Sequence, residues 1–188
     1  RNQSFVVDSL IAGIVNGALM GYVANGPFLI MEKGGLSSDG FSIIFAVNAF
    51  GLMVASFLES VLQKHIATDR MVKYALLFMT SVSIILLAAM YMEAGMPVIL
   101  VILFFYVFPI GVLFPTTTEL AITPFAENTS GTASAMFGSI QLAVAFVCTL
   151  ISGMMSNGTT VAVGLVFVFC CIVAFFVTFI GTARQVVT

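Results

Sequence analysis

Long apolar segments separated by short polar connectors dominate this chain of 188 residues. The segments span residues 5–31, 41–62, 71–92, 96–122, 132–155 and 160–182. Each is long enough to cross a bilayer as a helix, which takes about 20 residues. Because short connectors join antiparallel neighbours, the sequence predicts an all-α membrane protein, a six-transmembrane-helix bundle that forms a single domain over residues 1–188.

The composition supports a membrane protein and argues against several other classes. Hydrophobic residues make up 61% of the chain and charged residues 7%, against about 25% charged residues in an average soluble domain. The sequence has no basic patch of the kind that binds nucleic acid. Its single histidine, His65, lies in a basic connector, so a hydrolase would lack its base or its metal ligands. We therefore expect a protein that is not an enzyme and that holds no metal and no cofactor.

Basic residues predict the orientation of the chain. If the chain crosses the membrane six times, most of them fall on one side, namely Arg1, Lys64, Arg70, Lys73 and Arg184. Only Lys33 falls on the other side. Because Lys and Arg concentrate in cytoplasmic loops, both termini are expected in the cytoplasm. The first residue is not Met and the first apolar segment is too long for a signal peptide, which indicates an excised piece of a longer protein.

The six segments form two groups of three with the same order of character. The first and fourth carry prolines and polar residues, the second and fifth carry small residues around one amide, and the third and sixth are almost purely apolar. An odd number of helices per repeat gives the two copies opposite orientations in the membrane. The sequence therefore predicts two inverted three-helix repeats, residues 1–95 and 96–188, in which the third and sixth helices face lipid.

The first apolar segment has a stripe of small residues and a break near its end. Gly13, Gly17 and Gly21 recur at every fourth position, so the backbone of a second helix can approach this face closely. Gly26 and Pro27 follow, and proline removes a hydrogen-bond donor and clashes with the preceding turn. We expect close helix packing along the stripe and a bend or stop at Pro27.

Polar side chains lie beside this stripe. Asp8, Tyr22 and Asn25 share one side of the predicted helix, and polar groups at membrane depth face protein or water. We interpret this side as the wall of a cavity in which Tyr22 and Asn25 contact a substrate. Asp8 is a candidate for proton coupling. Alternatively, Asp8 has a purely structural role, because a carboxylate in the first turn of a helix complements the helix dipole.

Amides, hydroxyls and an aromatic residue mark three other segments as further substrate contacts. These candidates are Asn48, Tyr106, Thr116 and Gln141. Asn48 and Gln141 also have a structural interpretation, because amides commonly bond a neighbouring transmembrane helix. The hydroxyls of Thr116 to Thr118 can alternatively bond carbonyls that Pro115 leaves free.

Two acidic residues, Glu59 and Glu119, are further candidates for proton coupling. Both lie near the predicted cytoplasmic ends of their segments. Their alternative interpretation is that they reach the membrane interface, where charge is tolerated.

Two stretches carry the pattern of a known family. They are PFLIMEKGGLSSDGFSIIFAVNAFGLMVAS, residues 27–56, and FPTTTELAITPFAENTSGTASAMFGSIQLAVAF, residues 114–146. They resemble the carboxy-terminal half of a major facilitator superfamily transporter. The resemblance is greatest to the Bcr/CflA (bicyclomycin/chloramphenicol resistance) family of drug:proton antiporters.

The resemblance implies a secondary active transporter that performs multidrug efflux by drug:proton antiport with alternating access in the bacterial inner membrane. Its partners would be protons, an amphipathic small molecule and the amino-terminal six-helix half of the same transporter. The first and fourth helices would line the cavity, and the second and fifth would contact the other half. Two alternatives remain open: a half-size transporter or channel that pairs with a second copy of this chain, and a structural membrane protein without transport.

Overall fold

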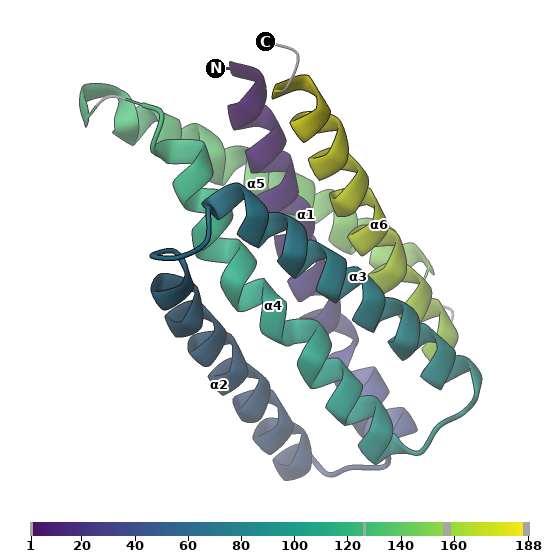
Figure 1. Ribbon diagram of the computed structural model, residues 1–188. Helices are drawn as coiled ribbons and strands as arrows, with labels where there is room; N and C mark the ends of the chain where they lie inside the picture. The colour runs from purple at the N-terminus through teal and green to yellow at the C-terminus, as the bar shows by residue number, and fades with distance from the viewer. Residues whose placement is uncertain (1, 126, 156–158, 186–188) are drawn as a thin grey trace.

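A computed structural model describes residues 2–125, 127–155 and 159–185, and these residues form helices and connectors without any strand (Figure 1). The helices are α1 (Asn2–Pro27), α2 (Ser38–Leu62), α3 (Thr68–Tyr91), α4 (Met96–Ile122), α5 (Glu127–Met155) and α6 (Thr160–Gln185), with a π-helix η1 (Phe28–Lys33) directly after α1. Six described helical segments are long and apolar enough to cross a membrane. The predicted six-helix membrane bundle is therefore confirmed.

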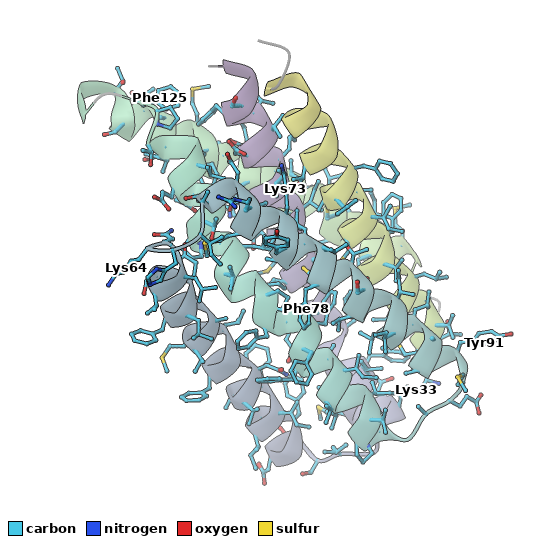
Figure 2. All side chains as sticks on the ribbon, viewed as in Figure 1. Lys33, Lys64, Lys73, Phe78, Tyr91 and Phe125 are labelled. Carbon is cyan, nitrogen blue, oxygen red and sulfur yellow. The ribbon has the colours of Figure 1, made fainter. Side chains whose placement is uncertain are left out.

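The start of α1 and the end of α6 lie at the same end of the bundle, as an even number of crossings requires (Figure 1). Lys64 and Lys73 lie toward this end and Lys33 toward the other (Figure 2). Arg1 and the side chain of Arg184 lie outside the described residues. The basic residues that the structure describes are thus distributed as the sequence predicts, and the assignment of this end to the cytoplasm stays a prediction.

Helices α1 and α4 form the centre of the bundle. α1 packs on α4, α5 and α6, and α4 packs on α1, α2 and α3, while α3 and α6 also pack on each other. In α1, 61% of the apolar window is buried, against 17% in α2 and 11% in α5. α2 and α5 therefore present most of their surface outward, and large apolar side chains such as Phe57 and Phe146 are exposed on them.

Helices α3 and α6 each divide into a buried and an exposed face. α3 buries Leu76 and Leu86 in the core and exposes Leu77 and Ile85. α6 buries Phe167 against the centre of the bundle. These two helices therefore contribute to the core, and only one face of each is available to lipid.

The α-helix α1 ends at Pro27 as predicted, but the helical backbone continues. Pro27 itself is helical, with φ −58° and ψ −46°, and the next six residues form the π-helix η1. Because Pro27 has no N–H, the α-helical bonding ladder lacks one bond there, and the wider i→i+5 turn of a π-helix follows. The chain leaves η1 through Gly35, whose φ of +66° is favourable only for glycine.

Glycines let pairs of helices approach closely, as the small stripe predicts. A Cβ atom at Gly13 would lie 2.6 Å from Cβ of Val144, and one at Gly17 would lie 2.5 Å from Cβ of Cys148, both on α5. On α4, a Cβ atom at Gly111 would lie 2.8 Å from Cβ of Ala55 on α2. α5 therefore packs on α1, and α2 on α4, so closely that only the hydrogen atom of a glycine fits between the helices at these points.

We predict that Gly17→Ala lowers the unfolding free energy by about 1–3 kcal/mol, the usual cost of overpacking a core. Gly138→Ala on α5 is the matched control, because a Cβ atom there meets nothing within 4 Å. Thermal unfolding of the purified protein in detergent measures both variants. Equal unfolding midpoints for Gly17→Ala and the control would contradict the close contact.

Candidate functional site

The α1–α2 contact contains a buried polar pair, Tyr22 and Asn48. The side-chain Nδ2 of Asn48 donates a hydrogen bond of 2.9 Å to the hydroxyl of Tyr22. Both side chains are 3% exposed. Tyr22 also stacks on Phe45 of α2, with ring centroids 6.0 Å apart and an interplanar angle of 8°. This pair is one of the interhelical bonds that the structural interpretation of Asn48 expects.

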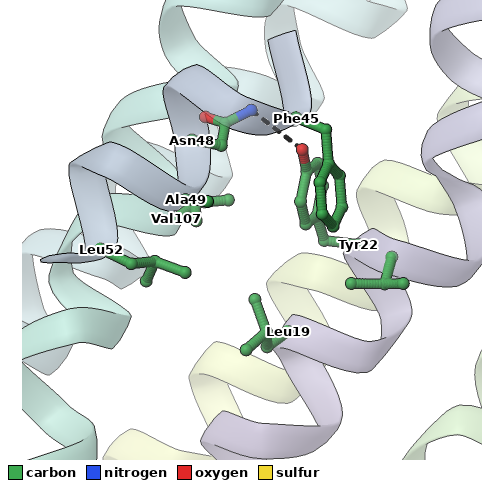
Figure 3. A pocket seen from close by; sticks show the side chains of 8 residues that line it. Leu19, Tyr22, Phe45, Asn48, Ala49, Leu52 and Val107 are labelled. Atoms are coloured by element: carbon green, nitrogen blue, oxygen red, sulfur yellow. Dashed lines mark hydrogen bonds between the residues drawn. The ribbon is translucent and has the colours of Figure 1, made fainter. Parts of the chain in front are cut away.

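A small pocket lies beside this pair (Figure 3). Its volume is about 120 Å³, and α1, α2 and α4 supply its walls. The lining residues are Leu19, Tyr22, Val23, Phe45, Asn48, Ala49, Leu52 and Val107. The pocket is thus apolar and aromatic apart from one phenol and one amide.

One buried hydrogen-bond acceptor beside the pocket lacks a partner. Oδ1 of Asn48 is buried and has no hydrogen-bond partner among the described residues. Pockets for small molecules commonly combine apolar walls with a few fixed polar groups, and they measure about 300–1,000 Å³. In this conformation the space therefore fits an apolar group, which is a portion of a drug-sized molecule.

Asn25 and Asp8 lie apart from this pocket. Asn25 turns to the other side of α1, where its Nδ2 donates to the carbonyl of Gly21 at 2.8 Å and to the hydroxyl of Ser152 on α5 at 3.0 Å. Asp8 is half-buried and lies about 21 Å from Tyr22 along the helix, at 1.5 Å per residue. α1 begins at Asn2, so Asp8 lies beyond the first turn and the dipole interpretation is wrong.

Tyr106 and Gln141 occupy two different environments. Tyr106 is 0% exposed in the core and stacks on Phe167 of α6, with ring centroids 4.8 Å apart. Its hydroxyl has no hydrogen-bond partner among the described residues. Gln141 is half-buried on α5, where its backbone carbonyl lies against Gly13. The structure does not bring either side chain to the Tyr22–Asn48 pocket.

Glu59, Glu119 and Thr116 meet at one end of the α2–α4 contact. Nε2 of Gln63 donates hydrogen bonds to Oε1 of Glu59 and to Oε2 of Glu119. Oγ1 of Thr116 shares its one proton between Glu59, at 3.1 Å, and the backbone carbonyl of Val112, at 2.6 Å. Glu59 is only 4% exposed, so its side chain is covered by protein, and its position relative to the membrane interface stays a prediction. Glu119 is exposed, which agrees with the interpretation that it reaches the interface.

The carbonyl that Pro115 leaves free is bonded from another helix. Pro115 has no N–H for the carbonyl of Gly111, four residues earlier, and Oγ of Ser56 on α2 donates to that carbonyl at 2.7 Å. The hydroxyls of Thr116, Thr117 and Thr118 bond the carbonyls of Val112, Leu113 and Phe114 instead. The threonine hydroxyls therefore do not bond the free carbonyl of Gly111. Ser56 on α2 bonds it instead.

Phe45 and Gln63 take part in these contacts but are not among the substrate-contact or proton-coupling candidates predicted from the sequence. Phe45 shares its α2 face with Asn48, three residues on, and this spacing is the signal for its place in the pocket. Gln63 lies four residues after Glu59, which places the amide beside the carboxylate on one helix. Among the described residues, no three His, Cys, Asp or Glu side chains gather in a way that could hold a metal ion.

Comparison with known proteins gives one informative match. The chain is similar to the uncharacterized MFS-type transporter YdgK of Bacillus subtilis (strain 168), with 24% identity over 160 residues. The match covers 85% of this chain and 39% of YdgK, so the chain corresponds to about two fifths of that protein. No protein-family model matches the chain. The similarity to YdgK supports membership of the major facilitator superfamily and an integral membrane location.

We predict that Thr116→Val lowers the unfolding free energy by about 1–3 kcal/mol, because the buried carboxylate of Glu59 loses a donor. Thr118→Val is the matched control, since Thr118 bonds only the carbonyl of Phe114. Chemical unfolding in detergent measures both variants alone and combined with Glu59→Gln. If Thr116→Val costs as much with Glu59→Gln as without it, the two side chains are not coupled.

Proposed function

We propose that the chain is the carboxy-terminal half of a secondary transporter of the Bcr/CflA type in the bacterial inner membrane. It expels amphipathic small molecules in exchange for protons by alternating access. The resemblance of residues 27–56 and 114–146 to that family supports this proposal, and so does the similarity to YdgK. The observation that carries it is the pocket between α1, α2 and α4, where a phenol and an amide lie among apolar walls.

The chemistry of the pocket favours an amphipathic substrate. Phe45 and Tyr22 offer aromatic surface. Oδ1 of Asn48 is buried beside the pocket, so it accepts a hydrogen bond from an amine or hydroxyl of the substrate only after the amide rotates toward the space. The open volume of about 120 Å³ accommodates only part of such a molecule. We therefore propose that a second half of the transporter completes the site.

The other candidate substrate contacts have supporting places in this scheme. Asn25 fixes α1 to α5 through Ser152, and Gln141 lies on α5. Tyr106 and Thr116 are fully buried in this conformation, so they contact substrate only after the central helices move. Movement of one helix bundle against the other is the basis of alternating access.

The outward surfaces of α2 and α5 support the second half as partner. These helices bury only 17% and 11% of their apolar windows in this chain. The matched region makes up only 39% of YdgK, so YdgK extends well beyond it. This favours another six-helix half over a second copy of the chain. Both termini are proposed to lie in the cytoplasm, on the side where the described basic residues are concentrated.

The helix contacts support two inverted repeats, residues 1–95 and 96–188. If α1, α2 and α3 are exchanged with α4, α5 and α6, the α1–α5 contact becomes α4–α2 and the α1–α6 contact becomes α4–α3. Both of these exchanged contacts occur in the bundle, and the α1–α4 and α3–α6 contacts map onto themselves. This is the pattern expected of two copies related by a two-fold axis.

Glu59 is the acid that we propose for proton coupling, ahead of Glu119 and Asp8. It is buried, and Gln63 and Thr116 both donate to its carboxylate. Ionisable groups at membrane depth commonly mark ion pathways. Protonation of Glu59 would weaken these bonds and loosen the α2–α4 contact, which connects the acid to the helix that carries Asn48.

We predict that Tyr22→Phe and Asn48→Leu in the intact protein each slow ethidium efflux about tenfold, the effect of one lost hydrogen bond of about 1.4 kcal/mol. Tyr91→Phe is the matched control, because Tyr91 is 77% exposed at the end of α3. Efflux is measured in inverted vesicles with an imposed pH gradient and corrected for the amount of protein. In the same assay, Glu59→Gln should keep downhill ethidium movement and lose its response to the gradient, whereas Glu93→Gln keeps both.

Normal efflux from both pocket variants would contradict the pocket as a substrate site. A normal gradient response in Glu59→Gln would remove Glu59 from proton coupling and leave the pocket assignment intact.

A further inference from the structure

Pro115 interrupts the backbone hydrogen bonding of α4 within the α2–α4 contact. Proline has no N–H, so the carbonyl of Gly111, four residues earlier, loses its usual partner. Oγ of Ser56 on α2 donates to this carbonyl at 2.7 Å. An unpaired backbone carbonyl is costly in a bilayer, and a serine of a neighbouring helix can satisfy it. A bond between two helices thus replaces a bond within one helix.

The short side chain of Ser56 reaches this carbonyl because the two helix backbones lie very close together here. A Cβ atom at Gly111 would lie 2.4 Å from the carbonyl oxygen of Leu52 and 2.8 Å from Cβ of Ala55, both on α2. A serine hydroxyl extends only one bond beyond Cβ. The Ser56–Gly111 bond therefore exists only while α2 and α4 keep this spacing, and it helps to fix that spacing.

The buried acid Glu59 lies on the next turn of the same contact. Ser56 and Glu59 are three residues apart, which places them on one face of α2. The residue after Pro115 is Thr116, and its hydroxyl lies 3.1 Å from Oε1 of Glu59 while it shares its proton with the carbonyl of Val112. α2 therefore contacts α4 on both sides of the proline, through Ser56 before it and through Glu59 directly after it.

Hydrogen bonds, rather than an opposite charge, surround the carboxylate of Glu59. Glu59 forms no ion pair within the described part of the chain. Glu119 of α4 is joined to it through Nε2 of Gln63. Lys64 and His65 are exposed in the connector at this end, and η1 packs on the opposite end of α2. The hydrogen bonds of this carboxylate therefore depend on how α4 is placed against α2.

We propose that Ser56 is a positioning residue for Glu59. By holding the carbonyl of Gly111, Ser56 fixes α4 before the proline and keeps Thr116 against the carboxylate. Protonation of Glu59 then releases only the segment of α4 after Pro115. Without the Ser56 bond, Thr116 is not held in place, so protonation of Glu59 changes little in the α2–α4 contact. This inference rests on the proposed role of Glu59 in proton coupling.

The same helix offers a matched control. Oγ of Ser60 donates to the carbonyl of Phe57 on α2 itself, and Ser60 is exposed. Ser60→Ala therefore removes a serine hydroxyl from α2 without removing a bond to α4. Ser56→Thr is the conservative variant, because threonine keeps the hydroxyl that bonds Gly111.

The first test is ethidium efflux by the intact protein in inverted vesicles, with and without an imposed pH gradient and corrected for the amount of protein. We expect Ser56→Ala to keep downhill ethidium movement and to lower its stimulation by the gradient about tenfold, the factor that one hydrogen bond supplies. Ser56→Thr and Ser60→Ala should keep both. A defect in folding alone would lower downhill movement as well.

Glu59→Gln in the same assay separates this inference from the proposed function. A gradient response that is lost in Glu59→Gln and normal in Ser56→Ala would overturn the positioning role of Ser56 and leave Glu59 as the coupling acid. A normal response in Glu59→Gln would overturn the coupling role of Glu59 and this inference with it. Equal loss in Ser56→Ala and Ser56→Thr would show that the hydroxyl is not the group that matters.

A second measurement tests the contact without transport. Hydrogen–deuterium exchange of the purified protein in detergent measures local opening of the α4 backbone. Ser56→Ala should speed exchange of residues 112–119 about tenfold, since one bond that holds this segment is lost. Residues 97–104 of the same helix should keep their rate. Equal exchange of residues 112–119 in Ser56→Ala and Ser60→Ala would overturn the proposal.

Discussion

The bundle depends on the close approach of two pairs of helices, α1 to α5 and α4 to α2. Lipid tails are as apolar as leucine, so helices in a bilayer associate through van der Waals packing and hydrogen bonds rather than through escape from water. Gly13 and Gly17 on α1 and Gly111 on α4 remove the Cβ atoms that would hold these pairs apart. Because α1 and α4 also pack on each other, the remaining helices are arranged around this central pair.

The contact of α2 with the centre has a different character from the rest of the core. α2 buries little apolar surface and is joined to α1 and α4 by directional bonds, from Asn48 to Tyr22, from Ser56 to Gly111 and from Thr116 to Glu59. These hydrogen bonds can be replaced by hydrogen bonds to a substrate or to water, or weakened when a carboxylate is protonated. Apolar packing in the core cannot be replaced in this way. The proposed substrate pocket and the proposed coupling acid both lie on this one contact, which connects substrate binding to proton binding through a single helix.

Much of the fold could be predicted from the sequence because its signals are local. Long apolar segments define the helices, short connectors make neighbours antiparallel, and the spacing of Gly13 and Gly17 marks the side of α1 on which another helix packs. The site was harder to predict, because its contacts join distant residues. Tyr22 and Asn25 share a side of the sequence-derived helix, yet they bond to α2 and α5 respectively. The depth of Glu59 in the protein depends on how α4 covers it, which no pattern within α2 reveals.

The central claim is that this chain forms one half of a transporter in which a second six-helix half covers α2 and α5. It is tested most directly by the mass of the native polypeptide, detected in its own membrane by an antibody against this chain. The account predicts a protein about twice the 20.0 kDa of this chain, as paired transporter halves require. A native polypeptide of 20.0 kDa would contradict it and would favour a transporter made of two identical copies.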